Sequence, residues 1–135
     1  MNTYEHFLHL LLTEFKNEAQ PHLRSLWADV EELEEVTDER RRSLTLRHAL
    51  HRTRALEWAA HSVNAHEVRA LGRDLERMLA DLAHTPAAVS RVSPAALHQT
   101  MNKLTEALCS VDAEPSAGGR ASVTSGVPLV ACGAD

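Results

Sequence analysis

Apolar residues recur at steps of three and four through most of the first 112 residues, which places them on one side of an α-helix. The first segment has this spacing in two stretches: Phe7, Leu8, Leu11, Leu12, Phe15 and Ala19, then Leu23, Leu26, Trp27, Val30 and Leu33. Pro21 lies between them. A proline inside a helix removes a backbone hydrogen bond and costs about 3 kcal/mol. The segment therefore predicts a long first helix, kinked or split at Pro21 and ending near Val36.

Three further segments have the same period. In the second segment, Leu46, Ala49, Leu50, Leu56 and Ala60 share one face with Thr53. The apolar positions are Val68, Leu71, Leu75, Met78 and Leu82 in the third segment, and Leu97, Met101, Leu104, Leu108 and Val111 in the last. Each set forms a stripe along one helix face. The sequence therefore predicts three more amphipathic helices.

Capping residues and prolines mark the ends of these helices. Thr37 or Asp38 can cap the second helix, and Ser62 or Asn64 can cap the third. Pro86 indicates that the third helix ends near His84. The last helix is predicted to begin with Ser93 as its cap and Pro94 at its first position.

Four amphipathic helices joined by short polar links can bury their stripes only against one another. We therefore expect an all-α fold, an antiparallel up-and-down four-helix bundle over residues 1–112. Residues 113–135 are rich in Gly, Ser, Ala, Pro and Val and have no helical period. This composition predicts a flexible low-complexity tail.

Charge and hydropathy exclude several classes of partner. The chain of 135 residues has 14 Lys and Arg against 19 Asp and Glu, and its net charge of −5 does not favour nucleic acid. The three arginines from Arg40 to Arg42 follow several acidic residues, which largely cancel their field. The longest apolar stretch is too short to cross a bilayer, and the N-terminus lacks the pattern of a secretion signal. We expect a cytoplasmic protein that binds neither nucleic acid nor membrane.

One of the nine histidines has a distinctive position. At 100° per residue, His51 lies opposite the apolar face of the second helix, on a strip with Arg47, Arg54 and Trp58. Ala55, one turn later, leaves room beside it. An exposed imidazole is a competent nucleophile toward phosphorus, and guanidinium groups can hold phosphoryl oxygens. The alternative is an ordinary surface histidine.

Residues 15–83 resemble the histidine phosphotransfer (Hpt) domain, most closely the version at the N-terminus of chemotaxis-type histidine kinases. The resemblance rests on three stretches: Phe15-x-x-Glu18-Ala19-x-x-x-Leu23-x-x-Leu26-x-x-x-Val30-x-x-Leu33, Leu46-x-x-x-Leu50-His51-Arg52-Thr53-Arg54-Ala55, and Arg73-Asp74-Leu75-Glu76-Arg77-Met78-Leu79. The second stands where the family has His-x-x-Lys-Gly. The third resembles the helix whose glutamate hydrogen-bonds the active imidazole in the family.

The resemblance implies a role for each matching residue. His51 would carry the phosphoryl group, Arg54 would be the cation three positions on, Glu76 would orient the imidazole, and Arg73 would be a second polar neighbour. Arg54 replaces the family's lysine and Ala55 its glycine. Thr53 stands where an aliphatic residue is usual.

The function implied is that of a phosphoryl carrier, not a stand-alone kinase, because the sequence has no Gly-rich phosphate loop. The partner would be a response-regulator receiver domain, a sensor histidine kinase, or both. The receiver domain would bring Mg²⁺ and the acyl phosphate, and this chain would bind no cofactor or metal. The alternative is a non-catalytic docking or adaptor module, a degenerate Hpt domain. In either case Arg47, Ala55 and Trp58 would contact the partner.

Overall fold

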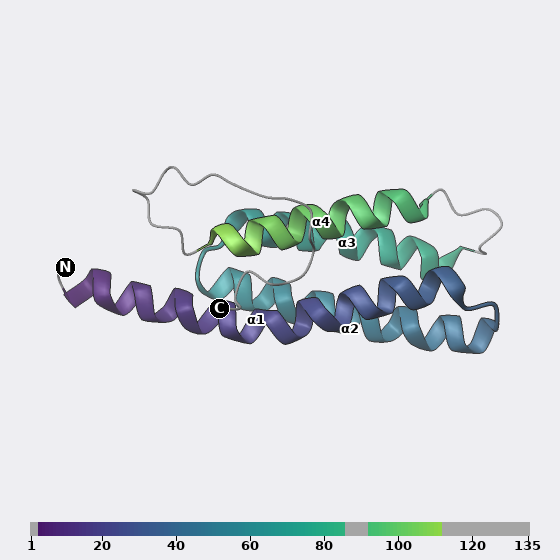
Figure 1. Ribbon diagram of the computed structural model, residues 1–135, viewed down its shortest axis with the longest axis horizontal. Coiled ribbons are helices and arrows are strands. Elements are labelled where there is room, and N and C mark those ends of the chain that lie inside the picture. The colour runs from purple at the N-terminus through teal and green to yellow at the C-terminus, as the bar shows by residue number, and fades with distance from the viewer. Residues whose placement is uncertain (1–2, 86–91, 112–135) are drawn as a thin grey trace.

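The computed structural model describes residues 3–85 and 92–111, and these residues form four helices with no strand (Figure 1). Helix α1 spans Thr3–Glu35, α2 spans Glu39–Ser62, α3 spans His66–His84 and α4 spans Pro94–Ser110. The predicted all-helical fold is confirmed.

The four helices form one antiparallel bundle. Successive helices run in opposite directions along its long axis (Figure 1), and α1 packs against α2, α2 against α3, α3 against α4 and α4 against α1. Each helix therefore has two neighbours, as in an up-and-down bundle.

A single apolar core runs between the helices. It consists of buried aliphatic, alanine, methionine and phenylalanine side chains from all four elements, among them Leu23, Leu26, Leu46, Leu56, Leu75, Leu79, Met101 and Leu104, all 1% exposed or less. Thr53 is also fully buried, and its hydroxyl donates to the Ala49 carbonyl at 2.8 Å. This internal hydrogen bond satisfies the one polar group of the Thr53 side chain.

Helix α1 is continuous through Pro21. The alternative of two helices in line is therefore wrong. Pro21 lies on the exposed side of α1, and so does Asn17. Because proline has no backbone N–H, the Asn17 carbonyl receives no hydrogen bond from residue 21. Water can bond to a carbonyl on the solvent side, so the proline is tolerated there.

The first three turns of α1 project beyond the other three helices (Figure 1). Tyr4, Phe7 and Leu10 are 69%, 55% and 53% exposed, and Leu8 and Leu11 are also exposed. The predicted apolar stripe is buried only from Phe15 onward. The prediction fails for Phe7, Leu8 and Leu11 because none of the other three helices extends far enough to cover them. We call residues 3–12 the overhang.

The predicted caps are confirmed at two of three helix starts. Asp38 accepts a hydrogen bond from the Arg41 amide at 3.0 Å, and Ser93 accepts one from the Ala96 amide at 3.1 Å. The third prediction is wrong, because Ala65 is the N-cap of α3 and has no capping side chain. Asn64 instead adopts φ 58°, a left-handed conformation that asparagine tolerates. The Ala65 amide then donates a hydrogen bond to the Ala60 carbonyl at 2.9 Å, which closes the turn between α2 and α3.

The predicted tail, residues 113–135, lies outside the described residues. Within 3–85 and 92–111, none of the helices combines the length and the apolar character needed to cross a bilayer.

Candidate functional site

His51 stands on the outer surface of α2. The side chains of Leu46, Thr53 and Leu56 turn into the core, and His51 is exposed on the opposite side, as predicted. Within the described part of the chain, no residue forms a hydrogen bond or an ion pair with its imidazole. Both ring nitrogens of His51 are therefore available to water or to a partner.

Arg54 and Glu76 meet across the contact between α2 and α3. The Arg54 Nε lies 2.9 Å from Glu76 Oε2, and the two side chains are 59% and 29% exposed. The resemblance implied that Glu76 would hydrogen-bond His51, and the structure directs this carboxylate to Arg54 instead. Arg54 is thereby turned toward α3. Glu76 is therefore placed to fix the guanidinium rather than the imidazole.

A second carboxyl group joins this pair. Burial raises the pKa of Glu57 to about 7, and its hydrogen bond with Glu76 adds to the rise. The pKa of Glu76 is lowered, first by the hydrogen bond from Glu57 and then by that from Arg54. The positive charge of Arg73 also lowers the pKa of both acids. Glu57, Glu76, Arg54 and Arg73 are thus one electrostatic cluster between α2 and α3, and Arg54 is the member of it that lies one turn from His51.

Gly72 makes room for Glu57 against α3. A Cβ atom at residue 72 would lie 2.8 Å from Glu57 Cγ, closer than real Cβ atoms approach. The glycine therefore permits the burial that raises the pKa of Glu57. Glu57 was not predicted from the sequence, although a glutamate three residues after Arg54 lies on the same side of a helix.

The three predicted partner-binding residues occupy the outer strip of α2. Arg47 is exposed, Ala55 is half-buried, and Trp58 is 72% exposed. The Trp58 ring meets His61 edge-on, with ring centroids 6.4 Å apart. A groove of about 470 Å³ lies between Trp58 and α1, with Leu11 and Phe15 on its far side. The groove shares Trp58 with the strip and Leu11 with the overhang.

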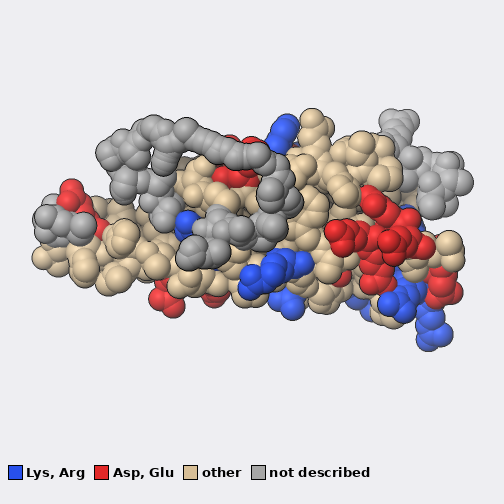
Figure 2. All heavy atoms as spheres, viewed as in Figure 1, with Lys and Arg blue, Asp and Glu red and all other residues tan. Residues whose placement is uncertain are grey.

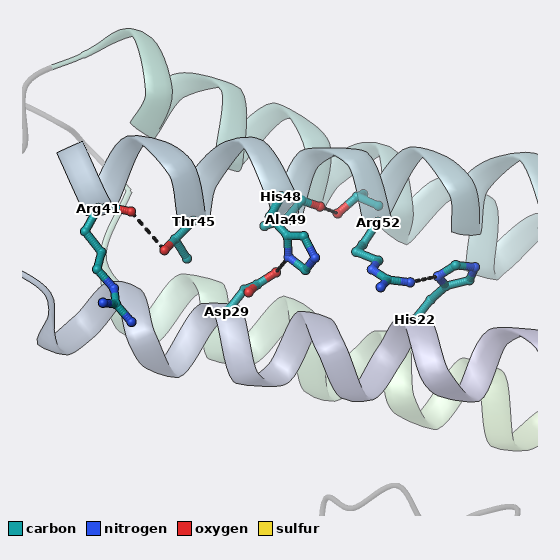
Figure 3. A network of polar contacts seen from close by, with 8 residues as sticks. His22, Asp29, Arg41, Thr45, His48, Ala49 and Arg52 are labelled. Carbon is teal, nitrogen blue, oxygen red and sulfur yellow. Dashed lines mark hydrogen bonds and ion pairs between the residues drawn. The ribbon is translucent and has the colours of Figure 1, made fainter. Parts of the chain in front are cut away.

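The side of α2 that faces α1 has polar pairs of its own (Figure 3). His48 Nδ1 lies 2.7 Å from Asp29 Oδ2, with side chains 47% and 13% exposed. Burial raises the pKa of Asp29, and the hydrogen bond with His48 opposes the rise. One turn later, an Arg52 Nη lies 3.0 Å from His22 Nδ1. Burial and the charge of Arg52 lower the pKa of His22.

These pairings were not predicted from the sequence. Asp29 adjoins Val30 in the apolar stripe of α1, and an acidic residue at the edge of a buried stripe requires a partner. That was the available signal, but it does not identify His48 as the partner.

Acidic and basic side chains are mixed near the end of the bundle where α1 stops (Figure 2). Arg41 pairs with Glu32 across the α1–α2 contact. The Arg42 Nη2 donates a hydrogen bond to the Leu82 carbonyl oxygen at 3.1 Å, and the Arg42 Nη1 lies 3.7 Å from Glu39 Oε2. Two of the three consecutive arginines are thus engaged by neighbouring groups, which agrees with the expected cancellation of their field.

In the part of the chain that the structure describes, no three His, Cys, Asp or Glu side chains are grouped so as to hold a metal ion. No family model matches the chain, and neither the curated proteins nor the solved structures contain a match.

Proposed function

We propose that this chain is a histidine phosphotransfer protein in which His51 accepts a phosphoryl group from a receiver domain and can return it. One observation carries the proposal. An exposed imidazole with no partner among the described residues lies between Arg47, four residues before it, and Arg54, three residues after it, on the outer face of the bundle. Such a nucleophile is accessible to a second protein, and both cations are within a helical turn of it.

In the proposed reaction, a His51 ring nitrogen attacks the phosphorus of an aspartyl phosphate in the receiver domain. The nitrogen–phosphorus bond forms as the phosphorus–oxygen bond breaks, and the aspartate leaves as a carboxylate. The receiver domain supplies Mg²⁺, because phosphoryl transfer depends mainly on positioning and charge stabilisation. Arg54 and Arg47 hold the oxygens of the transferred group.

Glu76 positions Arg54 in this scheme. Its 2.9 Å contact is with the Arg54 Nε, so the terminal nitrogens of the guanidinium have no partner among the described residues and can bind phosphoryl oxygens. Glu57 limits the negative charge that surrounds the arginine, because its pKa of about 7 keeps a large share of it protonated near neutral pH. Repulsion between the site and the incoming phosphate is reduced accordingly.

The test is transfer from a phosphorylated receiver domain to the full chain. We expect His51→Gln to abolish transfer and Arg54→Ala to slow it about tenfold, since a partly exposed cation stabilises charge less than a buried donor. His66→Gln is the matched control, because His66 is also exposed but lies on α3. Transfer at the normal rate to the His51→Gln variant would refute the proposal.

The second candidate is a docking module that accepts no phosphate. Trp58, 72% exposed, and the apolar overhang favour it, because exposed aromatic and aliphatic side chains anchor protein partners. A docking module would bind a receiver domain or a kinase equally well before and after His51→Gln, with no phosphoryl label in either form. Labelling of the wild-type chain at His51 separates the two candidates.

A further inference from the structure

The His48–Asp29 pair lies outside the proposed His51 site, on the side of α2 that faces α1 (Figure 3). Asp29 holds His48 through Nδ1 at 2.7 Å. A carboxylate that accepts the Nδ1 proton fixes the tautomer in which Nε2 has the free lone pair. Because the side chain of His48 is 47% exposed, a small molecule can reach the ring.

A groove of about 450 Å³ opens beside His48, a size that suits a small molecule. Three carboxylates line it, and each is already engaged: Asp29 by His48, Glu32 by Arg41, and Asp38 by the backbone amide of Arg41.

Arg40 also lines the groove, and it has no hydrogen bond or ion pair to any residue within 3–85 and 92–111. The groove therefore combines an oriented imidazole with a guanidinium that is free to bind phosphoryl oxygens.

We propose that His48 is a second phosphoryl-accepting residue, which reacts at Nε2 with small phosphoramidates and acyl phosphates. Nε2 attacks phosphorus, the bond from phosphorus to the leaving group breaks, and ammonia or a carboxylate departs. The Nδ1 proton stays in its hydrogen bond to Asp29, which stabilises the positive charge that develops on the ring. This reaction requires no receiver domain, so it is independent of the function proposed for His51.

The other histidines provide comparisons within the same chain. His84 Nδ1 contacts the Ala80 carbonyl at 2.8 Å, so its tautomer is also fixed, but by a neutral acceptor. His98 Nε2 lies 2.6 Å from Glu34 Oε2, and the His98 ring packs against Trp27. Only Nδ1, the nitrogen nearer the backbone, is then left to attack phosphorus. His6 and His51 are exposed and have no carboxylate partner among the described residues. His48 alone among these five combines a carboxylate on Nδ1 with an accessible Nε2.

The test is to incubate the full chain with phosphoramidate at mildly alkaline pH and to follow each histidine by mass spectrometry. We expect His48 to be labelled about tenfold faster than His51 and His6, with His84 between them. Asp29→Asn should remove most of this advantage at His48 alone, and Glu31→Gln, which neutralises an exposed acid on the same helix, should not.

The proposal is overturned if His48 reacts no faster than His51, or if Asp29→Asn slows every histidine equally while the helical circular dichroism is unchanged. Should Asp29→Asn fail to fold, the comparison of histidines in the wild-type chain decides alone. Either negative result leaves transfer from a receiver domain to His51 unaffected, and loss of that transfer leaves the labelling of His48 unaffected.

Discussion

Replacing Glu57 by glutamine should change how the stability of the bundle depends on pH. Glu57 lies between α2 and α3 in the space that Gly72 leaves open, and its pKa of about 7 exceeds the ordinary value of 4.5. The folded state therefore favours the protonated form. Glutamine is neutral at every pH and its amide can donate to Glu76 as the protonated acid does, so the variant reproduces the low-pH state permanently.

The sign follows from proton binding. Between about pH 5 and pH 7 the folded chain binds more protons at Glu57 than the unfolded chain does, so the contribution of this group to stability falls as pH rises. For a group shielded from water, the difference between these two pKa values would correspond to a loss of about 3 kcal/mol in the free energy of unfolding. Because Glu57 is only half-buried, screening by solvent reduces the expected loss to about 1 kcal/mol.

The assay is urea denaturation, followed by circular dichroism across this pH range. We expect Glu57→Gln and the wild type to be about equally stable near pH 5, and the variant to be about 1 kcal/mol more stable near pH 8. Glu31→Gln, at an exposed position of α1, should follow the wild type throughout. A difference between Glu57→Gln and wild type that stays constant with pH, or that reverses in sign, would refute the reasoning.

Three further changes test the packing of the bundle by the same denaturation assay. Leu26→Ala opens a cavity at a fully buried position and should cost about 2–5 kcal/mol; a cost near zero would contradict the placement of the core. Ser93→Ala removes the cap of α4 and should cost about 1 kcal/mol, whereas no loss would mean that the cap is not formed. Phe7→Ser in the overhang should change stability by less than about 0.5 kcal/mol, and a large loss would show that Phe7 is covered.

The fold could be predicted because its signals are local. The period of three and four residues gives the helices, and Asp38, Ser93 and Pro94 mark two of the starts through contacts within a few residues. The period identifies the apolar face of a helix, but not whether another helix covers it. The overhang was therefore wrongly predicted to be buried, although Phe7 and Phe15 belong to the same pattern.

The site was only partly predictable, for a related reason. The exposure of His51 follows from its angle on one helix. The pairing of Arg54 with Glu76 and of His48 with Asp29 depends on how far one helix is shifted along its neighbour. That shift is set by packing between helices, and spacing within one helix does not reveal it.

The most direct measurement of the central claim is to locate the phosphoryl group after transfer from a phosphorylated receiver domain to the wild-type chain. The product would be fragmented under alkaline conditions, in which phosphohistidine survives, and mapped by mass spectrometry. With a receiver domain freed of the small phosphoryl donors that we expect to label His48, we predict a single modified residue, His51, on the exposed face of α2. A phosphoryl group found on a different histidine, or none on any residue while the receiver domain binds, would contradict it.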